Sequence, residues 1–273
     1  MLKQRLLTAA VLIPIVVFAI LFSPSSIFQY LLAGIVGLAG YEWFSIIGFK
    51  TVKQQLFAFL SLLLVTVLLS FFTVLALQLL TISTWLIITL FIGVFAHKTL
   101  PNKVAVVFKN KIMALLMAIF VLALFWHGGV QLHASTTVGP QQLLFVMVLV
   151  WLADTGGYFA GKRWGKTALA KAISPNKSWE GVGGALFLGS IWALLGFISD
   201  LSGSLSLFSW LLLSAVALAI SVSGDLFESL FKRCYDVKDS GKLLPGHGGM
   251  LDRIDSLIAA VPVFTAGLFL LGA

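Results

Sequence analysis

Residues 56–80 read LFAFLSLLLVTVLLSFFTVLALQLL, and this stretch decides the class of fold. It contains no charged residue and is longer than the roughly 20 residues with which an α-helix crosses a lipid bilayer. It also lacks the polar stripe that marks a helix on the surface of a soluble domain. The stretch is therefore predicted to lie in a membrane.

The rest of the chain has the same character. Of its 273 residues, 60% are hydrophobic and 10% are charged, whereas a soluble domain has about 25% charged residues. Helices are predicted because lipid tolerates no open backbone hydrogen-bonding groups and the alternation of barrel strands is absent. Nine candidate spans cover residues 6–22, 27–48, 56–80, 83–96, 112–127, 141–161, 182–199, 205–228 and 254–272; the fourth is short and could form a broken pair with the third. The predicted fold is an all-α, polytopic integral membrane protein.

The basic residues predict the orientation of these spans. With the N-terminus in the cytoplasm, all 18 Lys and Arg residues fall in segments on the cytoplasmic side, and the outside loops hold none. The positive-inside rule therefore predicts a cytoplasmic N-terminus and a multi-pass location in the inner (plasma) membrane. The net charge of +8 is accounted for by topology and anionic ligands, so no nucleic-acid partner is expected.

Composition divides the chain near Gly139. Residues 1–138 are predicted to be N-terminal transmembrane helices with plain loops. Residues 139–273 are predicted to be a C-terminal transmembrane catalytic region with polar cytoplasmic loops. The one cysteine, Cys234, excludes an intrachain disulfide and a CxxC metal site. Because it follows two basic residues on the predicted cytoplasmic side, it is expected to be a reactive, accessible thiol.

Two polar segments of the second half carry candidate site residues. Asp154 lies within a predicted span, where an ionisable side chain either lines a site or is paired. The glycines around it permit close helix approach. Ser178 and Glu180 precede an apolar run and resemble a helix cap. Lys177, beside that helix N-terminus, suits a phosphate.

A third polar segment, residues 223–256, is the most informative. Asp225 and Ser229 are four residues apart and share a helix face. Asp252 and Asp255 are three apart at the start of the last span. Carboxylates of this kind suit Mg²⁺, which proteins hold with one or two carboxylates plus substrate phosphates. A Gly-His-Gly-Gly loop can present N–H groups to an anion. Phosphate charge can be neutralised by Lys232, Arg233, Lys238 and Arg253.

These segments together carry a family resemblance. Residues 229–255, SLFKRCYDVKDSGKLLPGHGGMLDRID, resemble the signature of the phosphatidate cytidylyltransferase, or CDP-diacylglycerol synthase, family. DTGGYFAG at 154–161 and SPNKSWEG at 174–181 are similar to further elements of that family; at Ser178 the family often carries Thr, so the hydroxyl is kept. The resemblance covers residues 139–273. It implies a Mg²⁺-dependent, dimeric enzyme that joins CTP and phosphatidate into CDP-diacylglycerol and pyrophosphate.

The resemblance and the side-chain chemistry together suggest roles. The expected metal ligands are Asp225 and Asp252, with Asp255 or Glu228 as helpers and room for a second cation. The groups expected around the nucleotide phosphates are Ser229, Lys232, Arg233, Lys238, Asp239 and His247. The other substrate-binding residues are expected to be Lys177, Ser178, Asp154, Glu180 and Arg253. Of these, Lys177 and Ser178 would contact a phosphate such as that of the lipid, while Asp154 and Glu180 would orient basic neighbours.

Two alternatives stay open. A CTP-dependent kinase acting on a polyisoprenoid alcohol also needs lipid access and acidic metal ligands. A secondary transporter would use Asp154 as an ion site, but such proteins often show inverted repeats and charges at the midplane. Here the charges gather at one face of the membrane and no repeat is visible, which disfavours a transporter.

Overall fold

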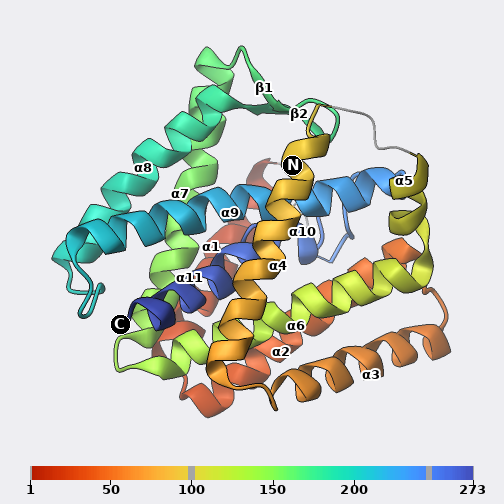
Figure 1. Ribbon diagram of the computed structural model, residues 1–273, viewed down its shortest axis with the longest axis horizontal. Helices are drawn as coiled ribbons and strands as arrows, with labels where there is room; N and C mark the ends of the chain where they lie inside the picture. Colours follow the sequence, from red (N-terminus) through yellow and green to blue (C-terminus); the bar gives the residue numbers. More distant parts are fainter. Residues whose placement is uncertain (1, 98–101, 244–247, 273) are drawn as a thin grey trace. The chain divides into compact units, whose positions relative to one another are not determined.

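The computed structural model describes residues 2–97, 102–243 and 248–272, which are predominantly helical (Figure 1). In chain order the elements are α1 (Leu2–Phe22), α2 (Ser25–Ile47), α3 (Val52–Leu69), α4 (Val74–Phe95), α5 (Asn102–Lys109), α6 (Lys111–Ser135), α7 (Gly139–Trp164), β1 (Ala168–Ala170), β2 (Ser174–Ser178), α8 (Trp179–Ile198), α9 (Leu207–Cys234), α10 (Leu251–Ile254) and α11 (Leu257–Leu271).

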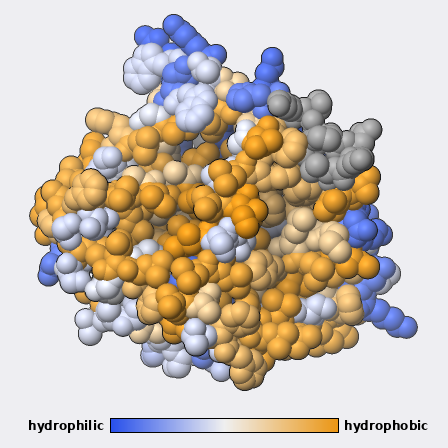
Figure 2. All heavy atoms as spheres, in the orientation of Figure 1, coloured by the Kyte–Doolittle hydropathy of each residue, from blue (hydrophilic) through white to orange (hydrophobic). Residues whose placement is uncertain are grey.

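The surface of these helices is that of a membrane protein. Among the described residues, eight helices are long and apolar enough to cross a bilayer, and a further apolar helical segment, Ala10–Phe22, is shorter. Large apolar side chains are exposed, including Leu79, Leu86 and Leu90 on α4. Figure 2 shows hydrophobic residues over most of the visible face. Apolar surface of this extent is suited to lipid. The prediction of an all-α, polytopic membrane protein is confirmed, and its orientation stays a prediction.

One predicted boundary is wrong. Residues 56–80 are not a single helix, because α3 ends at Leu69 and α4 begins at Val74. Thr73 is the N-cap of α4, and its hydroxyl accepts a hydrogen bond from a backbone N–H of the first turn at 3.3 Å. A threonine cap between two apolar runs leaves no trace in hydropathy. Consequently α4 is a span of 22 residues rather than a short one.

Two features of the second half extend beyond the predicted spans. The span predicted to end at residue 228 belongs to α9, which continues as a helix to Cys234 and so carries several predicted site residues. Between α7 and α8 the chain forms an antiparallel hairpin, β1–β2, in which Ala168 pairs with Ser178 and Ala170 with Ser174. This hairpin was not predicted.

Contacts divide the chain into two compact units, and each unit draws on both halves of the sequence. The first unit comprises Met1–Phe72, Asn102–Leu144 and Phe231–Asp255. The second comprises Thr73–Pro101, Phe145–Leu230 and Ser256–Ala273. The division near residue 139 separates a region without predicted site residues from a predicted catalytic region. It is a statement about function rather than packing, so these two units do not test it, and it stays a prediction.

In the first unit, α2, α3 and α6 pack against one another. His133 of α6 connects this group to the start of α2. Its Nε2 lies 2.9 Å from the backbone oxygen of Ile20, and its Nδ1 lies 2.9 Å from Ser25 Oγ. Its ring stacks on Phe28 with centroids 4.0 Å apart. The buried imidazole is therefore satisfied and has a structural role.

In the second unit, α7 and α8 approach closely through glycines. A Cβ atom on Gly184 of α8 would meet the backbone oxygen of Gly156 and the Cβ of Ala160, both on α7. The expectation that glycines around Asp154 permit close helix packing is confirmed. This contact sets the spacing of the two helices from which the hairpin emerges (Figure 1).

Candidate active site

The carboxylate of Asp252 organises the α9–α10 loop, of which the structure describes residues 235–243 and 248–250. Lys232 Nζ donates to its Oδ1 at 2.9 Å, and the two side chains are only 14% and 9% exposed. The N–H of Gly249 donates to Oδ2 at 2.9 Å, and the N–H of Ser240 reaches both oxygens at 3.1 and 3.0 Å. Charge-assisted bonds of this kind hold their partners in place. Two predicted site residues, one on α9 and one on α10, are thus brought together.

Glu42 of α2, which no motif marks, also contacts this loop. Its side chain is 3% exposed. Its Oε2 accepts hydrogen bonds from Ser240 Oγ at 3.0 Å and from the N–H of Leu251 at 2.9 Å. A signal for it was present in the sequence. An ionisable residue inside a predicted span is by default functional or paired, and this rule, which singled out Asp154, applies equally to Glu42.

The glycines of the loop are explained by these carboxylates. A Cβ atom on Gly241 would meet the Glu42 carboxylate, and one on Gly249 would meet both Glu42 and Ser240 Oγ. Gly248 has a φ of +86°, a conformation that favours glycine. The Gly-His-Gly-Gly segment was predicted to present N–H groups to an anion. One of these groups, the N–H of Gly249, donates to the carboxylate of Asp252 within the protein.

Asp225 lies in the second unit with partners of its own. It forms an ion pair with Lys177 of β2, and these side chains are 23% and 27% exposed. Ser229, one turn later on α9, donates from its hydroxyl to Asp225 Oδ1 at 3.2 Å. The prediction that Asp225 and Ser229 share a helix face is confirmed. The structure therefore joins three predicted site residues from β2 and α9.

The hairpin is held at the start of α8 by two side chains. Ser178 is the N-cap of α8, and its Oγ accepts a hydrogen bond from the N–H of Gly181 at 3.1 Å, as the expected cap requires. Glu180 accepts from the N–H of Thr167 at 3.2 Å, so its carboxylate holds the segment that enters β1. Lys177 is the residue just before this cap, which fixes the position of its backbone.

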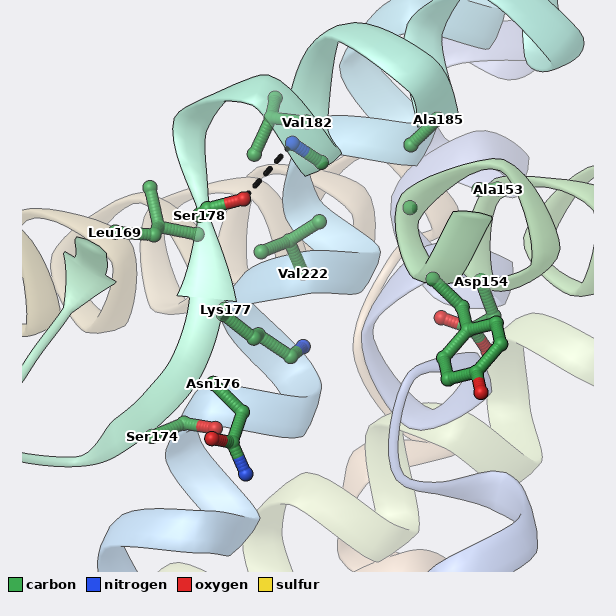
Figure 3. Close-up of a pocket in the computed structure, with 13 residues that line it drawn as sticks. Ala153, Asp154, Leu169, Ser174, Asn176, Lys177, Ser178, Val182, Ala185 and Val222 are labelled. Carbon is green, nitrogen blue, oxygen red and sulfur yellow. Dashed lines mark hydrogen bonds between the residues drawn. The ribbon is translucent and has the colours of Figure 1, made fainter. Parts of the chain in front are cut away.

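A cavity of about 320 Å³ lies beside this hairpin within the second unit (Figure 3). Lys177 and Asn176 enter it from β2, and Asp154 lies on the facing wall from α7. Its polar lining is completed by Tyr158, Ser174 and Ser178, and its apolar lining consists of Ala153, Leu169, Val182, Ala185 and Val222, with Gly157 and Gly181. The cavity therefore joins a cationic group to an apolar wall built from membrane helices. Asp154 is thus one of the residues that line this cavity.

The remaining predicted residues lie around the α9–α10 loop. Four of them are exposed: Arg233, Lys238, Asp239 and Arg253. Asp255 is half-buried directly after α10. His247 lies outside the described residues.

The predicted reactivity of Cys234 is wrong. The thiol is buried at the end of α9, only 8% exposed. The next residue, Tyr235, is also partly buried, and its hydroxyl donates to the backbone oxygen of Phe108 at 3.0 Å. Burial raises the pKa of this phenol, which therefore remains a neutral donor.

The two predicted metal ligands differ in their capacity for a hard cation. A carboxylate offers about four lone-pair positions. Asp225 uses two of them, for Lys177 and Ser229, so its donor set fits Mg²⁺ bound together with substrate phosphates, which is how proteins commonly hold this ion. Asp252 accepts four hydrogen bonds from three donors, so it would have to release Lys232 or an N–H group of the loop to bind the ion. In the part of the chain that the structure describes, no three His, Cys, Asp or Glu side chains form a metal-binding group.

Comparison with known proteins identifies the family to which the chain belongs. A family model described as the cytidylyltransferase family matches residues 3–271. A phosphatidate cytidylyltransferase of Pseudomonas aeruginosa is 38% identical over 274 residues, which cover 100% of this chain and 98% of the relative. One of Haemophilus influenzae is 40% identical over 296 aligned residues, which cover 97% of this chain and 98% of the relative. One of Staphylococcus aureus is 43% identical over 141 residues, which cover 50% of this chain and 52% of the relative. Because the family model and two relatives match almost the entire chain, the chain belongs to the cytidylyltransferase family.

Proposed function

We propose that the protein transfers the cytidylyl group of CTP to phosphatidate and so makes CDP-diacylglycerol and pyrophosphate for phospholipid biosynthesis. The observation that carries this proposal is the end-to-end match with two phosphatidate cytidylyltransferases. The site supports it, since two Lys–Asp pairs occur in polar segments next to membrane helices. A soluble nucleotide and a membrane lipid can meet only at such a position.

The reaction requires positioning and charge neutralisation more than proton transfer. An oxygen of the phosphatidate phosphate attacks the α-phosphorus of CTP. The bond from that phosphorus to the bridging oxygen of the β-phosphate breaks, and pyrophosphate leaves. The attacking phosphate is already an anion near neutral pH, because its second pKa is about 6. Lys232 and Lys177, each oriented by an aspartate, would hold phosphate oxygens and offset the charge of the reacting groups.

The cavity beside the hairpin is the proposed site of the lipid phosphate. Its lysine and hydroxyl groups suit a phosphate monoester, and its apolar wall suits the adjoining acyl chains. Its volume of about 320 Å³ lies at the lower end of the range for ligand pockets. That size favours a lipid headgroup there over a whole nucleotide. The exposed basic residues and the Lys232–Asp252 pair around the α9–α10 loop would then serve the nucleotide phosphates.

Magnesium is the proposed cofactor. Asp225 and Asp252 are the residues that would hold it, with substrate phosphates completing its ligands. When bound, it would supply positive charge to the phosphate oxygens that become more negative during the transfer. A second cation, a homodimer, an inner-membrane location and a site that faces the cytoplasm are further parts of the proposal, and all of them derive from the family resemblance or the charge distribution.

The position of the radiolabel in CTP separates the proposed reaction from its alternative. Purified protein in detergent micelles is given CTP and Mg²⁺ with either phosphatidate or a polyisoprenoid alcohol. We expect α-³²P label to enter the lipid product with phosphatidate and γ-³²P label to leave as pyrophosphate. Transfer of γ-³²P to the alcohol with release of CDP would identify a kinase instead. If the protein is folded and neither the α-³²P nor the γ-³²P label of CTP enters a lipid product, both reactions are contradicted.

A further inference from the structure

Two consecutive residues of α2 contact the chain at both ends of the α9–α10 loop. Trp43, which is 1% exposed, packs edge-to-face on Phe231 of α9 with ring centroids 5.3 Å apart. Glu42 accepts the N–H of Leu251 at the other end and the hydroxyl of Ser240 within the loop. The conformation of the loop is therefore supported by a helix from the N-terminal part of the sequence.

A hydrogen-bond network leads from Glu42 to the charged pair. Ser240 Oγ donates to Glu42 and accepts from the N–H of Asp252 at 3.3 Å. The N–H of Ser240 in turn donates to the carboxylate of Asp252, which holds Lys232 Nζ. A shift of Ser240 would consequently move both charged groups. Glu42 thus acts on Lys232 and Asp252 through one intervening residue.

The state of the Glu42 carboxylate is unusual for a residue with only a packing role. Its Oε2 accepts two hydrogen bonds, whereas Oε1 has no hydrogen-bond partner within the described residues. A buried and partly satisfied carboxylate opposes folding. An apolar side chain would suit the interior of α2 better. What the carboxylate contributes is the fixed position of the loop.

We propose that Glu42 is a positioning residue for the transfer reaction, because it holds the α9–α10 loop in the conformation in which Lys232 and Asp252 meet the nucleotide phosphates. The inference rests on the proposed function. In reactions at phosphorus, catalysis comes mainly from positioning, and a misplacement of about 1 Å can lower a rate about 10²-fold. Glu42 itself needs no contact with substrate to have this effect.

Three variants of the full chain test the role. Glu42→Gln keeps the length of the side chain and one acceptor oxygen, so we expect kcat/KM for CTP to stay within about tenfold of the wild type. Glu42→Asp is too short to reach Ser240, and Glu42→Ala has no acceptor. Each should lower kcat/KM for CTP about 10²-fold. The KM for phosphatidate should not change, because the proposed lipid site lies on other elements.

The matched control is Gln55→Ala on α3 of the same unit. Gln55 is also buried, and its amide donates to Ser45 Oγ at 3.0 Å and to the backbone oxygen of Phe49, neither of which belongs to the loop. We expect this variant to lose thermal stability without a change in KM for CTP. If Glu42→Ala lost activity only in proportion to folded protein, as Gln55→Ala should, Glu42 would be structural. Wild-type kinetic constants for CTP in folded Glu42→Ala would also overturn the proposal.

A second test uses the steric contact and does not depend on activity. The three atoms nearest to a Cβ on Gly241 all belong to Glu42. Gly241→Ala should therefore lower the melting temperature in the wild type and much less in the Glu42→Ala background, a coupling that a double-mutant cycle measures. Gly34→Ala on α2, where a Cβ meets nothing within 4 Å, is the control and should be additive.

The two experiments distinguish the possible failures. An inactive but folded wild-type protein would refute the proposed function, and the catalytic part of this inference with it, while the coupling between residues 42 and 241 would still report on support of the loop. Additive melting temperatures would refute the support of the loop by Glu42, even in an active enzyme. Coupling together with a selective effect on CTP kinetics is the result that we expect.

Discussion

Asp225 and Asp252 differ in what their carboxylates hold. Asp225 contacts two side chains, Lys177 and Ser229, whereas Asp252 holds Lys232 and two N–H groups of the α9–α10 loop. We expect Asp225→Asn and Asp252→Asn each to lower kcat about 10²-fold, the loss typical of one charge-stabilising group. Only Asp252→Asn should also lower thermal stability clearly, because an amide NH₂ would then face backbone donors. Steady-state rates and thermal unfolding of the purified variants measure both effects.

Asp236→Asn is the matched control for these two variants. Asp236 is exposed at the start of the same loop, and its φ of +55° is a conformation that asparagine also adopts. Its replacement should leave rates and stability unchanged. Near-normal turnover of Asp225→Asn or Asp252→Asn at ordinary Mg²⁺ concentrations would exclude that residue from the proposed metal site.

Lys177 tests the assignment of the cavity to the lipid phosphate. Its side chain lines the cavity and pairs with Asp225. Loss of a charge-assisted hydrogen bond corresponds to a change of about 10-fold or more in binding, so Lys177→Gln should raise the KM for phosphatidate by that factor. Lys171→Gln, an exposed change in the turn of the same hairpin, should have no effect. An unchanged KM in Lys177→Gln would mean that Lys177 serves only to set topology.

At the scale of elements, the cavity depends on the spacing of α7 and α8. A Cβ on Gly184 would meet Ala160 and the backbone of Gly156, whereas one on Gly183 meets nothing within 4 Å. Overpacking of this kind destabilises by about 1–3 kcal/mol. We therefore expect Gly184→Ala to lower the melting temperature and to raise the KM for phosphatidate, and Gly183→Ala to do neither. Equal behaviour of the two neighbours would show that close helix contact does not define the cavity.

The elements that hydropathy could predict are the long spans, and those it could not are the turns between them. The break at Thr73 depends on one hydroxyl that caps a helix, and the surrounding residues are as apolar as a helix interior. The β1–β2 hairpin is too short for a periodic signal, with strands of three and five residues. The predicted span ends at residue 228, but charged residues can end a span without ending a helix, and α9 continues to Cys234.

The candidate site was predictable where one motif contains both partners. Asp225 and Ser229 lie one helical turn apart, and their hydrogen bond follows from that spacing. Partners distant in sequence were not predictable, because spacing carries no information about them. The contact of Glu42 with Ser240 spans 198 positions. The reactivity expected of Cys234 failed for a related reason, since its burial depends on how the end of α9 packs, which local charges do not reveal.

The predicted topology of the chain is asymmetric, and this asymmetry relates orientation to function. In that topology all 18 basic residues, which include the lysines of the two Lys–Asp pairs, fall on one side of the membrane. A substrate such as CTP carries several negative charges and does not cross a bilayer, so its site must face the compartment that supplies it. The distribution that sets orientation under the positive-inside rule therefore also concentrates positive charge where an anionic nucleotide would arrive.

This orientation can be tested with single cysteines, because the natural thiol is buried. Cys234 should be silent toward a membrane-impermeant maleimide in folded protein. Lys171→Cys places an exposed thiol in the hairpin, and Thr137→Cys places one in the turn between α6 and α7. We expect the hairpin thiol to be labelled only in inside-out vesicles and the turn thiol only in intact cells. The opposite pattern would put the hairpin outside the cell, where no CTP is supplied, and would overturn the proposed access of nucleotide from the cytoplasm. Labelling of the unaltered chain from either side would instead contradict the burial of Cys234.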